Sequence, residues 1–216
     1  NTKVRGRKDL EDLSIPFIGE IPQYFSKERK LGFKRKKQSY MKTIVVKEGS
    51  RDIINEAFRV LRSNMDFMAG KDKGQNVFVL TSFNPGSGKS FLTMNIAMSF
   101  AIKKKRILVI DGDLRHGSVS SYVDSPRIGL SDYLGNRVEN WKEIIVADKK
   151  YDNLHILPIG TVPPNPTELL EDGKLATLIG ALRGEYDYIF IDCPPIDIVA
   201  DAQIIEKLAD RTIFVV

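Results

Sequence analysis

From residue 76 onward, short uninterrupted apolar runs alternate with longer segments of helical periodicity, and this alternation restricts the possible folds more than any other feature. An apolar run without polar alternation is typical of a strand buried on both faces. The expected strands are residues 76–82, 106–113, 153–160, 186–195 and 212–216, and the expected helices are residues 51–68, 90–104, 167–184 and 200–209. Strands and helices in this order form right-handed βαβ units. The sequence therefore predicts an α/β fold, with an open, mainly parallel sheet and helices on both faces.

The helix expected over residues 51–68 has one apolar stripe and one polar face. Its expected limits are an N-cap at Ser50 and a stop at Gly70. The stripe is predicted from spacings of three and four residues. Its members are Ile53, Ile54, Ala57, Val60, Leu61, Met65 and Met68.

The positive charge of the chain is concentrated in one segment. Lys and Arg number 33 against 28 Asp and Glu, a net charge of +5. Residues 27–42 hold eight basic residues against Glu28 alone, so the remainder of the chain is slightly acidic. This distribution argues against nucleic acid as a partner of the globular part. It confines contact with a polyanion, such as anionic lipid headgroups, to the basic run, for which a solvated linker is the alternative.

Two regions follow from these patterns. Residues 1–45 contain two prolines, the basic run and little periodicity, and are expected to be an N-terminal arm or linker. Residues 46–216 are expected to form the globular domain. Because the final strand has no helix after it, we expect the chain to be a fragment that is truncated at its C-terminal end. A single cysteine, Cys193, excludes an internal disulfide and favours a reducing compartment.

The segment NPGSGKS, residues 84–90, lies between an expected strand and an expected helix. Its glycines let backbone N–H groups turn toward phosphate oxygens, and the helix that follows directs its positive dipole end at the same anion. Lys89 supplies charge to the β and γ phosphates of ATP, and the Ser90 hydroxyl is placed to bind Mg²⁺. The predicted nucleotide-binding residues are Asn84, Pro85, Gly86, Ser87, Gly88, Lys89, Ser90 and Phe91. The strict pattern G-x-x-x-x-G-K-[ST] has Gly where this chain has Phe83, and an ordinary glycine-rich turn is the alternative.

Carboxylates follow two of the apolar runs, Asp111 in ILVIDGDLR and Asp192 in YIFIDCPP. Since parallel strands end at one edge of a sheet, both acids are expected to meet the phosphate loop there. An acid after an apolar strand usually holds Mg²⁺ or its waters, although either acid alone is equally consistent with a helix cap or a turn. The metal ligands predicted from this arrangement are Ser90, Asp113 and Asp192.

The turn IDGDLR carries more chemistry than one metal ligand requires. Asp111 and Asp113 are able to divide two tasks, accepting the proton of an incoming hydroxyl and holding the Mg²⁺ shell. Arg115 completes a predicted catalytic set with Lys89 and the two acids. A surface ion pair is the alternative for this arginine.

These residues resemble a known family, the bacterial tyrosine kinases. ILVIDGDLR is similar to the Walker A′ motif of the family, in which three apolar residues precede D-x-D-x-R. The E-x-x-R-x-x-R helix of the family matches Glu56, Arg59 and Arg62 in EAFRVLR. SIPFIGEIP at residues 14–22, GTVPPNPTELL at residues 160–170 and the apolar run before Asp192 are also similar, so the resemblance covers roughly residues 14–216.

The resemblance implies a P-loop NTPase-like fold and an ATP- and Mg²⁺-dependent protein tyrosine kinase. Such an enzyme autophosphorylates between subunits of a ring and regulates capsular or exopolysaccharide synthesis and export. The implied location is the cytoplasmic face of the inner or cell membrane. The implied partners are other copies of the chain, a membrane-spanning polysaccharide export protein or segment, and the tyrosine-rich C-terminal tail of a neighbour. The seven tyrosines of this chain are scattered instead of clustered.

The same resemblance implies that Glu56, Arg59 and Arg62 form a subunit contact. From the residues alone, these charges are an ordinary solvated helix face.

Two other functions remain open at this stage. The first is an ATPase switch of the partition or division-site type, which places a second lysine early in the phosphate loop where this chain has Asn84. The second is a non-catalytic assembly module that holds bound nucleotide. The IDGDLR turn argues against the ATPase switch, and the full set of acids argues against the non-catalytic module.

Overall fold

The computed structural model describes residues 4, 6–23, 43–70, 74–196 and 200–216. The basic run predicted as a polyanion contact falls within residues 24–42, outside the described residues. No helix in the described ranges is long and apolar enough to cross a membrane.

The described residues form a six-stranded sheet in the order β3-β4-β2-β5-β1-β6. The strands are β1 (Val77–Ser82), β2 (Ile107–Asp111), β3 (Val146–Ala147), β4 (Leu154–Leu157), β5 (Tyr188–Asp192) and β6 (Arg211–Val215). The five strands expected from the apolar runs are present and pair in parallel. The two-residue edge strand β3, which the sequence pattern did not indicate, pairs antiparallel with β4.

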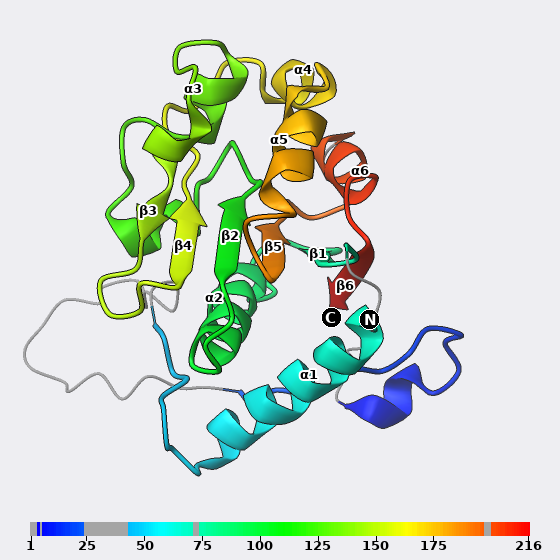
Figure 1. Ribbon diagram of the computed structural model, residues 1–216. Helices are drawn as coiled ribbons and strands as arrows, with labels where there is room; N and C mark the ends of the chain where they lie inside the picture. Colours follow the sequence, from blue (N-terminus) through cyan, green and yellow to red (C-terminus); the bar gives the residue numbers. More distant parts are fainter. Residues whose placement is uncertain (1–3, 5, 24–42, 71–73, 197–199) are drawn as a thin grey trace, which may run out of the picture.

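Helices cover both faces of this sheet (Figure 1). The helices are α1 (Ile53–Ala69), α2 (Lys89–Ala101), α3 (Leu130–Leu134), α4 (Pro166–Glu171), α5 (Lys174–Leu182) and α6 (Ala200–Glu206). Short 3₁₀ turns occupy Arg7–Leu10, Ser120–Val123 and Trp141–Ile144. Alternate strand residues point to opposite faces, so Phe78 packs with α1 and α2 while Val79 packs with α3 to α6. The predicted three-layer α/β fold is confirmed.

The single helix expected over residues 167–184 is wrong. The segment forms two helices, because Gly173 adopts a left-handed conformation (φ 79°) between the end of α4 and the start of α5. Glycine adopts this conformation without the steric cost that a Cβ imposes. The apolar periodicity continues through the break, so the pattern alone did not reveal it.

Helix α1 is rotated relative to the expectation. Its N-cap is Asp52 instead of Ser50, since the Asp52 side chain accepts a hydrogen bond from the backbone N–H of Asn55 (2.9 Å). The side chains of Ile53 and Val60, expected inside, are 74% and 55% exposed. The buried residues are Asn55, Phe58, Leu61, Met65 and Ala69. The helix stop at Gly70 is confirmed.

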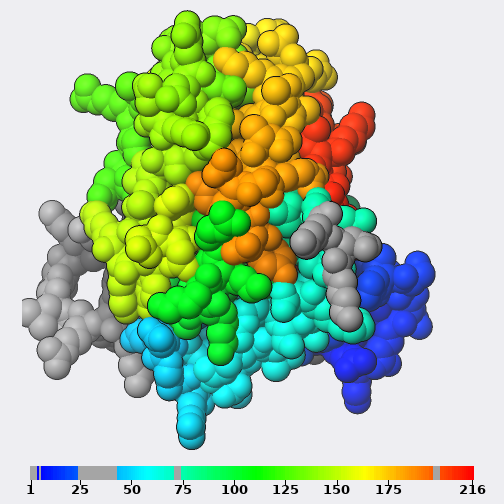
Figure 2. Space-filling model, in the orientation of Figure 1, coloured from blue at the N-terminus to red at the C-terminus, as the bar shows by residue number. Residues whose placement is uncertain are grey.

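Part of the N-terminal arm packs on the domain. The backbone carbonyl of Ile18 accepts a hydrogen bond from the Asn64 amide of α1 (2.8 Å), and Ile18 and Ile21 contact the core beneath it. Figure 2 shows the described arm residues, in dark blue, against the cyan surface of α1. The segment before α1 is held by Asn95 of α2, whose side-chain oxygen accepts the N–H groups of Val45 (2.7 Å) and Val46 (3.2 Å).

Candidate active site

The loop at residues 84–90 joins β1 to α2, as the sequence predicts. Gly86 and Gly88 both have positive φ (78° and 85°), and Gly88 is the N-cap of α2. Lys89, the first residue of α2, is largely buried and donates a hydrogen bond from Nζ to Ser82 Oγ at the end of β1 (3.0 Å). The start of a 13-residue helix and its loop therefore present N–H groups and a lysine at the same place.

Phe83 occupies the position where the strict loop pattern has glycine. Its ring makes an edge-to-face contact with Phe214 of β6, with centroids 4.7 Å apart. The side chain therefore packs against the neighbouring strand, and the two glycines that follow provide the turn. The departure from the pattern does not alter the strand–loop–helix arrangement.

Asp192 at the end of β5 is buried beside the start of α2. Its carboxylate accepts a hydrogen bond from Ser90 Oγ (2.5 Å) and contacts Thr93 Oγ1 (3.2 Å). Burial raises the pKa of Asp192 to about 6, although the hydrogen bonds and the charge of Lys89 act in the opposite direction. Ser90 and Asp192, two of the three residues predicted to hold Mg²⁺, thus lie in contact, and Thr93 is an additional partner of Asp192 on the same helix.

Asp111 ends β2 and lies directly opposite Asp192 in the register of β2 with β5. Its Oδ2 accepts hydrogen bonds from the backbone N–H (2.6 Å) and Oγ (2.7 Å) of Ser120. Its Oδ1 is buried without a hydrogen-bond partner. Burial and the adjacent carboxylate of Asp192 raise the pKa of Asp111 to about 8. The charge of Asp192 thus disfavours ionisation of Asp111 until positive charge is present, which is one feature expected of a cation site.

Asp113 and Arg115 lie on the turn after β2 and point to different partners. The Asp113 carboxylate is close to the His116 ring (Nδ1–Oδ2 3.0 Å). Arg115 Nε pairs with the buried carboxylate of Asp201 in α6 (3.1 Å), and Thr167 of α4 contacts the same two residues. The ion pair that was the alternative for Arg115 is therefore present within the chain.

Several of these partners were missed by the sequence reasoning. Ser120, Thr93 and Asp201 belong to no recognisable motif, and Thr167 is the second residue of α4, whose N-cap is Asn165. Only the regular spacing of Thr93 one turn after Lys89 provides a sequence signal.

The oxygen donors suit Mg²⁺ bound together with phosphates. Within the described ranges, no group of three or more Asp, Glu, His or Cys side chains converges on one metal position. Mg²⁺ characteristically uses one or two carboxylates and completes its shell with water and substrate phosphate oxygens. Ser90 Oγ and the Asp192 carboxylate, in contact with each other at the start of α2, supply such donors. The residues present therefore fit a magnesium–nucleotide complex.

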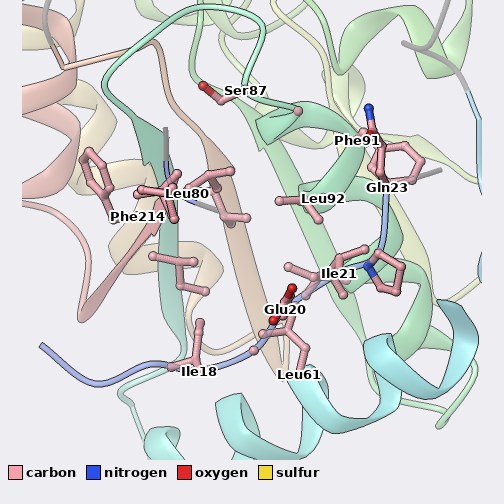
Figure 3. A pocket seen from close by; sticks show the side chains of 18 of the residues that line it. Ile18, Glu20, Ile21, Gln23, Leu61, Leu80, Ser87, Phe91, Leu92 and Phe214 are labelled. Carbon is pink, nitrogen blue, oxygen red and sulfur yellow. The ribbon is translucent and has the colours of Figure 1, made fainter. Parts of the chain in front are cut away.

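A groove of about 770 Å³ adjoins the phosphate loop. Figure 3 shows Ser87 of the loop at one end, Leu80 and Phe214 of the sheet and Leu92 of α2 along its sides, and arm residue Ile21 across it. The groove thus brings the arm, the sheet and the loop together.

The three residues of the predicted subunit contact do not share one environment. Glu56 and Arg59 form an ion pair on the outer side of α1 (2.5 Å). Arg62 instead turns toward α2 and donates to the backbone carbonyl (2.9 Å) and Oγ (3.0 Å) of Ser99. Glu56 and Arg59 therefore lie on the outer side of α1, where Arg59 also donates to the Ser50 carbonyl (2.7 Å), whereas Arg62 faces α2.

Comparison with known proteins places these features in a family. The model of an AAA domain family matches residues 75–215. Tyrosine-protein kinase CpsD of Streptococcus pneumoniae is 35% identical over 81% of this chain and 77% of its own length. Tyrosine-protein kinase Wzc of Salmonella typhimurium is 36% identical over the whole of this chain, which spans about 30% of Wzc. The solved kinase domain of Escherichia coli tyrosine kinase ETK superposes with a TM-score of 0.82 at 26% identity, covering 96% of this chain and 80% of that domain.

The division-site ATPases are less similar. MinD of Pyrococcus horikoshii, solved with Mg-ADP, matches 65% of this chain and 57% of its own length, with a TM-score of 0.56 and 28% identity. The kinase match thus covers a larger share of this chain than the MinD match, and its TM-score is higher. The partition-type alternative is not favoured. The chain belongs to the bacterial tyrosine-kinase family and is a protein tyrosine kinase domain of the P-loop NTPase-like fold.

Proposed function

We propose that this chain transfers the γ-phosphoryl group of ATP to the hydroxyl of a tyrosine presented by another polypeptide. The observation that carries the proposal is the meeting of the phosphate loop with two adjacent buried acids, Asp111 and Asp192, at the carboxyl edge of one sheet. A hydrolytic switch needs the loop and a metal ligand. The second buried acid, with a free oxygen, supplies the proton acceptor that a tyrosine acceptor requires.

Each residue has a stated task in this proposal. Lys89 and the N–H groups of the loop bind the β and γ phosphates, and charge stabilisation of this kind accounts for most phosphoryl-transfer catalysis. Ser90, Asp192 and Asp113 would hold Mg²⁺ directly or through water, and the bound ion would neutralise charge on the phosphates. Oδ1 of Asp111 accepts the tyrosine proton. Arg115 positions the turn between Asp111 and Asp113 through its ion pair with Asp201.

The proposal extends to the setting of the enzyme. The CpsD and Wzc relatives are named as tyrosine-protein kinases, and the motifs of this chain resemble those of capsule and exopolysaccharide systems. We place the domain at the cytoplasmic face of the cell membrane, beside a membrane-spanning export protein or segment. Residues 1–45 act as the arm that connects to that partner, and residues 46–216 act as the kinase domain.

In this proposal the copies of the chain associate in a ring, so that each active site receives the acceptor tyrosines of a neighbouring copy. The outer side of α1 exposes Ile53, Val60 and Phe67 at intervals of seven residues, next to the Glu56–Arg59 pair. Exposed apolar side chains in one row are typical of a protein contact surface. This face would receive a neighbouring copy and bring its C-terminal tyrosines toward Asp111.

One labelling experiment tests the proposed reaction. The protein is incubated with Mg²⁺, γ-labelled ATP and a tyrosine-rich copolymer, and the label is followed into protein and into free phosphate. Label in phosphotyrosine is the expected result. Free phosphate without labelled protein would support the ATPase switch, and bound but unreacted ATP would support the assembly module.

A further inference from the structure

Ser120 is a buried residue outside every motif of the site, yet it touches the site directly. It begins the 3₁₀ turn Ser120–Val123, nine residues after Asp111. Its backbone N–H and its hydroxyl oxygen lie 2.6 Å and 2.7 Å from the same oxygen of Asp111, Oδ2. Ser120 is therefore the side chain that holds this carboxylate.

The direction of the hydroxyl proton follows from a third contact. The backbone N–H of Ile159 donates to Ser120 Oγ (2.9 Å). An N–H group only donates, so the serine oxygen is the acceptor in that bond and its single proton is free for Asp111. The Ser120 hydroxyl thus links the loop after β4 to the end of β2 through two consecutive hydrogen bonds, from the Ile159 N–H to Ser120 and from Ser120 to Asp111.

The loop after β4, whose Ile159 N–H donates to Ser120, is itself hydrogen-bonded to α3. Backbone N–H groups at the start of α3 donate to its carbonyls, Leu130 to Pro158 (2.8 Å) and Ser131 to Ile159 (2.9 Å). Ser120 is therefore hydrogen-bonded to a loop that is itself hydrogen-bonded to a helix. Its hydroxyl oxygen has little freedom to move with the carboxylate of Asp111.

The consequence for Asp111 is a fixed orientation. Because both donors meet one oxygen, rotation of the carboxylate would break both hydrogen bonds at once, and hydrogen bonds to a charged group are stronger than neutral ones. The other oxygen, Oδ1, is left buried and unpartnered. A buried polar atom without a partner is rare and requires a reason, and a reacting group is one such reason.

We propose that Ser120 is a positioning residue for the kinase reaction, which orients the Asp111 carboxylate so that Oδ1 faces the acceptor hydroxyl. This inference rests on the proposed function, in which Asp111 accepts the tyrosine proton. Ser120 is 2% exposed, so in this proposal it acts through Asp111 and not by contact with ATP or tyrosine. Its removal is therefore expected to change the rate of transfer and to leave nucleotide binding nearly intact.

The test compares three variants with the wild type. Ser120→Ala removes the hydroxyl and keeps the backbone N–H, and we expect kcat for tyrosine to fall roughly 10- to 100-fold, as for other small misplacements of a reacting group. The KM for ATP and the Mg²⁺ dependence should change less than about twofold. Ser120→Thr keeps a hydroxyl and should restore most of kcat.

Ser121→Ala is the matched control. Ser121 is the next residue, and its hydroxyl donates to the Ser118 carbonyl (2.7 Å) without touching Asp111. Its kcat should equal that of the wild type. A general loosening of the turn would instead lower kcat in both alanine variants, and that result would overturn the proposal, as would wild-type kcat in folded Ser120→Ala.

Crystal structures of the wild type and Ser120→Ala provide a readout that does not depend on activity. A rotated Asp111 carboxylate in the variant supports the proposal, and an unchanged carboxylate overturns it. Absence of phosphotyrosine with the wild-type protein would refute the proposed function alone, since the two crystal structures would still decide whether Ser120 orients Asp111.

Discussion

Lys89 is the residue whose charge the proposed chemistry needs most. Its side chain is largely buried, and among the described residues its amino group donates to the Ser82 hydroxyl, so Met, which keeps most of the stem, should preserve packing. We expect Lys89→Met to lower phosphoryl transfer by about 10²–10³-fold, the usual loss for one preorganised contact to transition-state charge. Initial rates with labelled ATP, beside a thermal melt, measure both effects. Lys103→Met, beyond the other end of α2, is the control, and a folded Lys89→Met protein with wild-type turnover would contradict the site.

Asp111 ties the stability of the ligand-free protein to pH. Its pKa is about 8 in the folded chain and about 3.9 in an unfolded one, so between these values the folded chain binds the extra proton. The free energy of unfolding should therefore fall as pH rises from 4 to 8, by up to about 1.4 kcal/mol per pH unit from this group. Asp111→Asn removes the titrating carboxyl group, so the free energy of unfolding of the variant should fall less steeply with pH. The variant should therefore be more stable than the wild type at pH 8.

Urea unfolding at pH 5, 6, 7 and 8, without Mg²⁺ or nucleotide, measures this difference. Asp124→Asn, which alters an exposed acid paired with Lys149, is the matched control and should parallel the wild type. Parallel curves for Asp111→Asn and the wild type would show that Asp111 carries no extra proton.

Between elements, α2 connects the active site to the segment that precedes α1. Asn95 is fully buried, and its oxygen accepts the N–H groups of Val45 and Val46 while its amide donates to the Thr43 carbonyl (3.0 Å). Asn95→Leu keeps a similar volume and leaves two buried N–H groups unpaired, which should destabilise the protein by about 2–4 kcal/mol.

Hydrogen exchange at the Val45 and Val46 amides, together with urea unfolding, checks this effect. Asn64→Leu, which loses one exposed contact to the arm, should cost less than about 1 kcal/mol. Unchanged protection of both valine amides in Asn95→Leu would mean that α2 does not hold this segment.

At the scale of the whole molecule, the outer side of α1 decides whether the domain assembles as proposed. Phe67 is 87% exposed and Val60 is 55% exposed, so Val60→Ser with Phe67→Ser should leave the monomer folded and shift the protein toward monomer. Arg59→Ala should weaken association chiefly at low salt, because exposed ion pairs are screened. Sedimentation velocity at two ionic strengths, paired with the trans-phosphorylation assay, measures both. Ile128→Ser, another exposed apolar residue, is the control, and an oligomer that survives all these changes would exclude this face.

The helices and strands themselves follow from local chemistry, and most could be predicted. A continuous apolar run has few stable alternatives to a buried strand, so the strands β1, β2, β4, β5 and β6 and their parallel pairing were predictable. The phosphate loop was predictable for a similar reason, since its glycines act on the backbone around them. Local patterns did not predict the break at Gly173, because the apolar periodicity continues through it. They did not predict the antiparallel strand β3 either, because its two residues are too few to show a period.

What the sequence by itself determined is the α/β layering, the loop and the presence of acids at the ends of two strands. Which groups touch was decided only by the tertiary structure. Ser120 meets Asp111 and Asp201 meets Arg115 because turns and helices far from the motif are brought to one sheet edge by packing. The rotation of α1 was decided in the same way, by the packing of Phe58 in the core beside Phe91 of α2 (ring centroids 6.3 Å apart). Contacts between separated segments depend on the summed packing of the whole core, and no local pattern of residues encodes that sum.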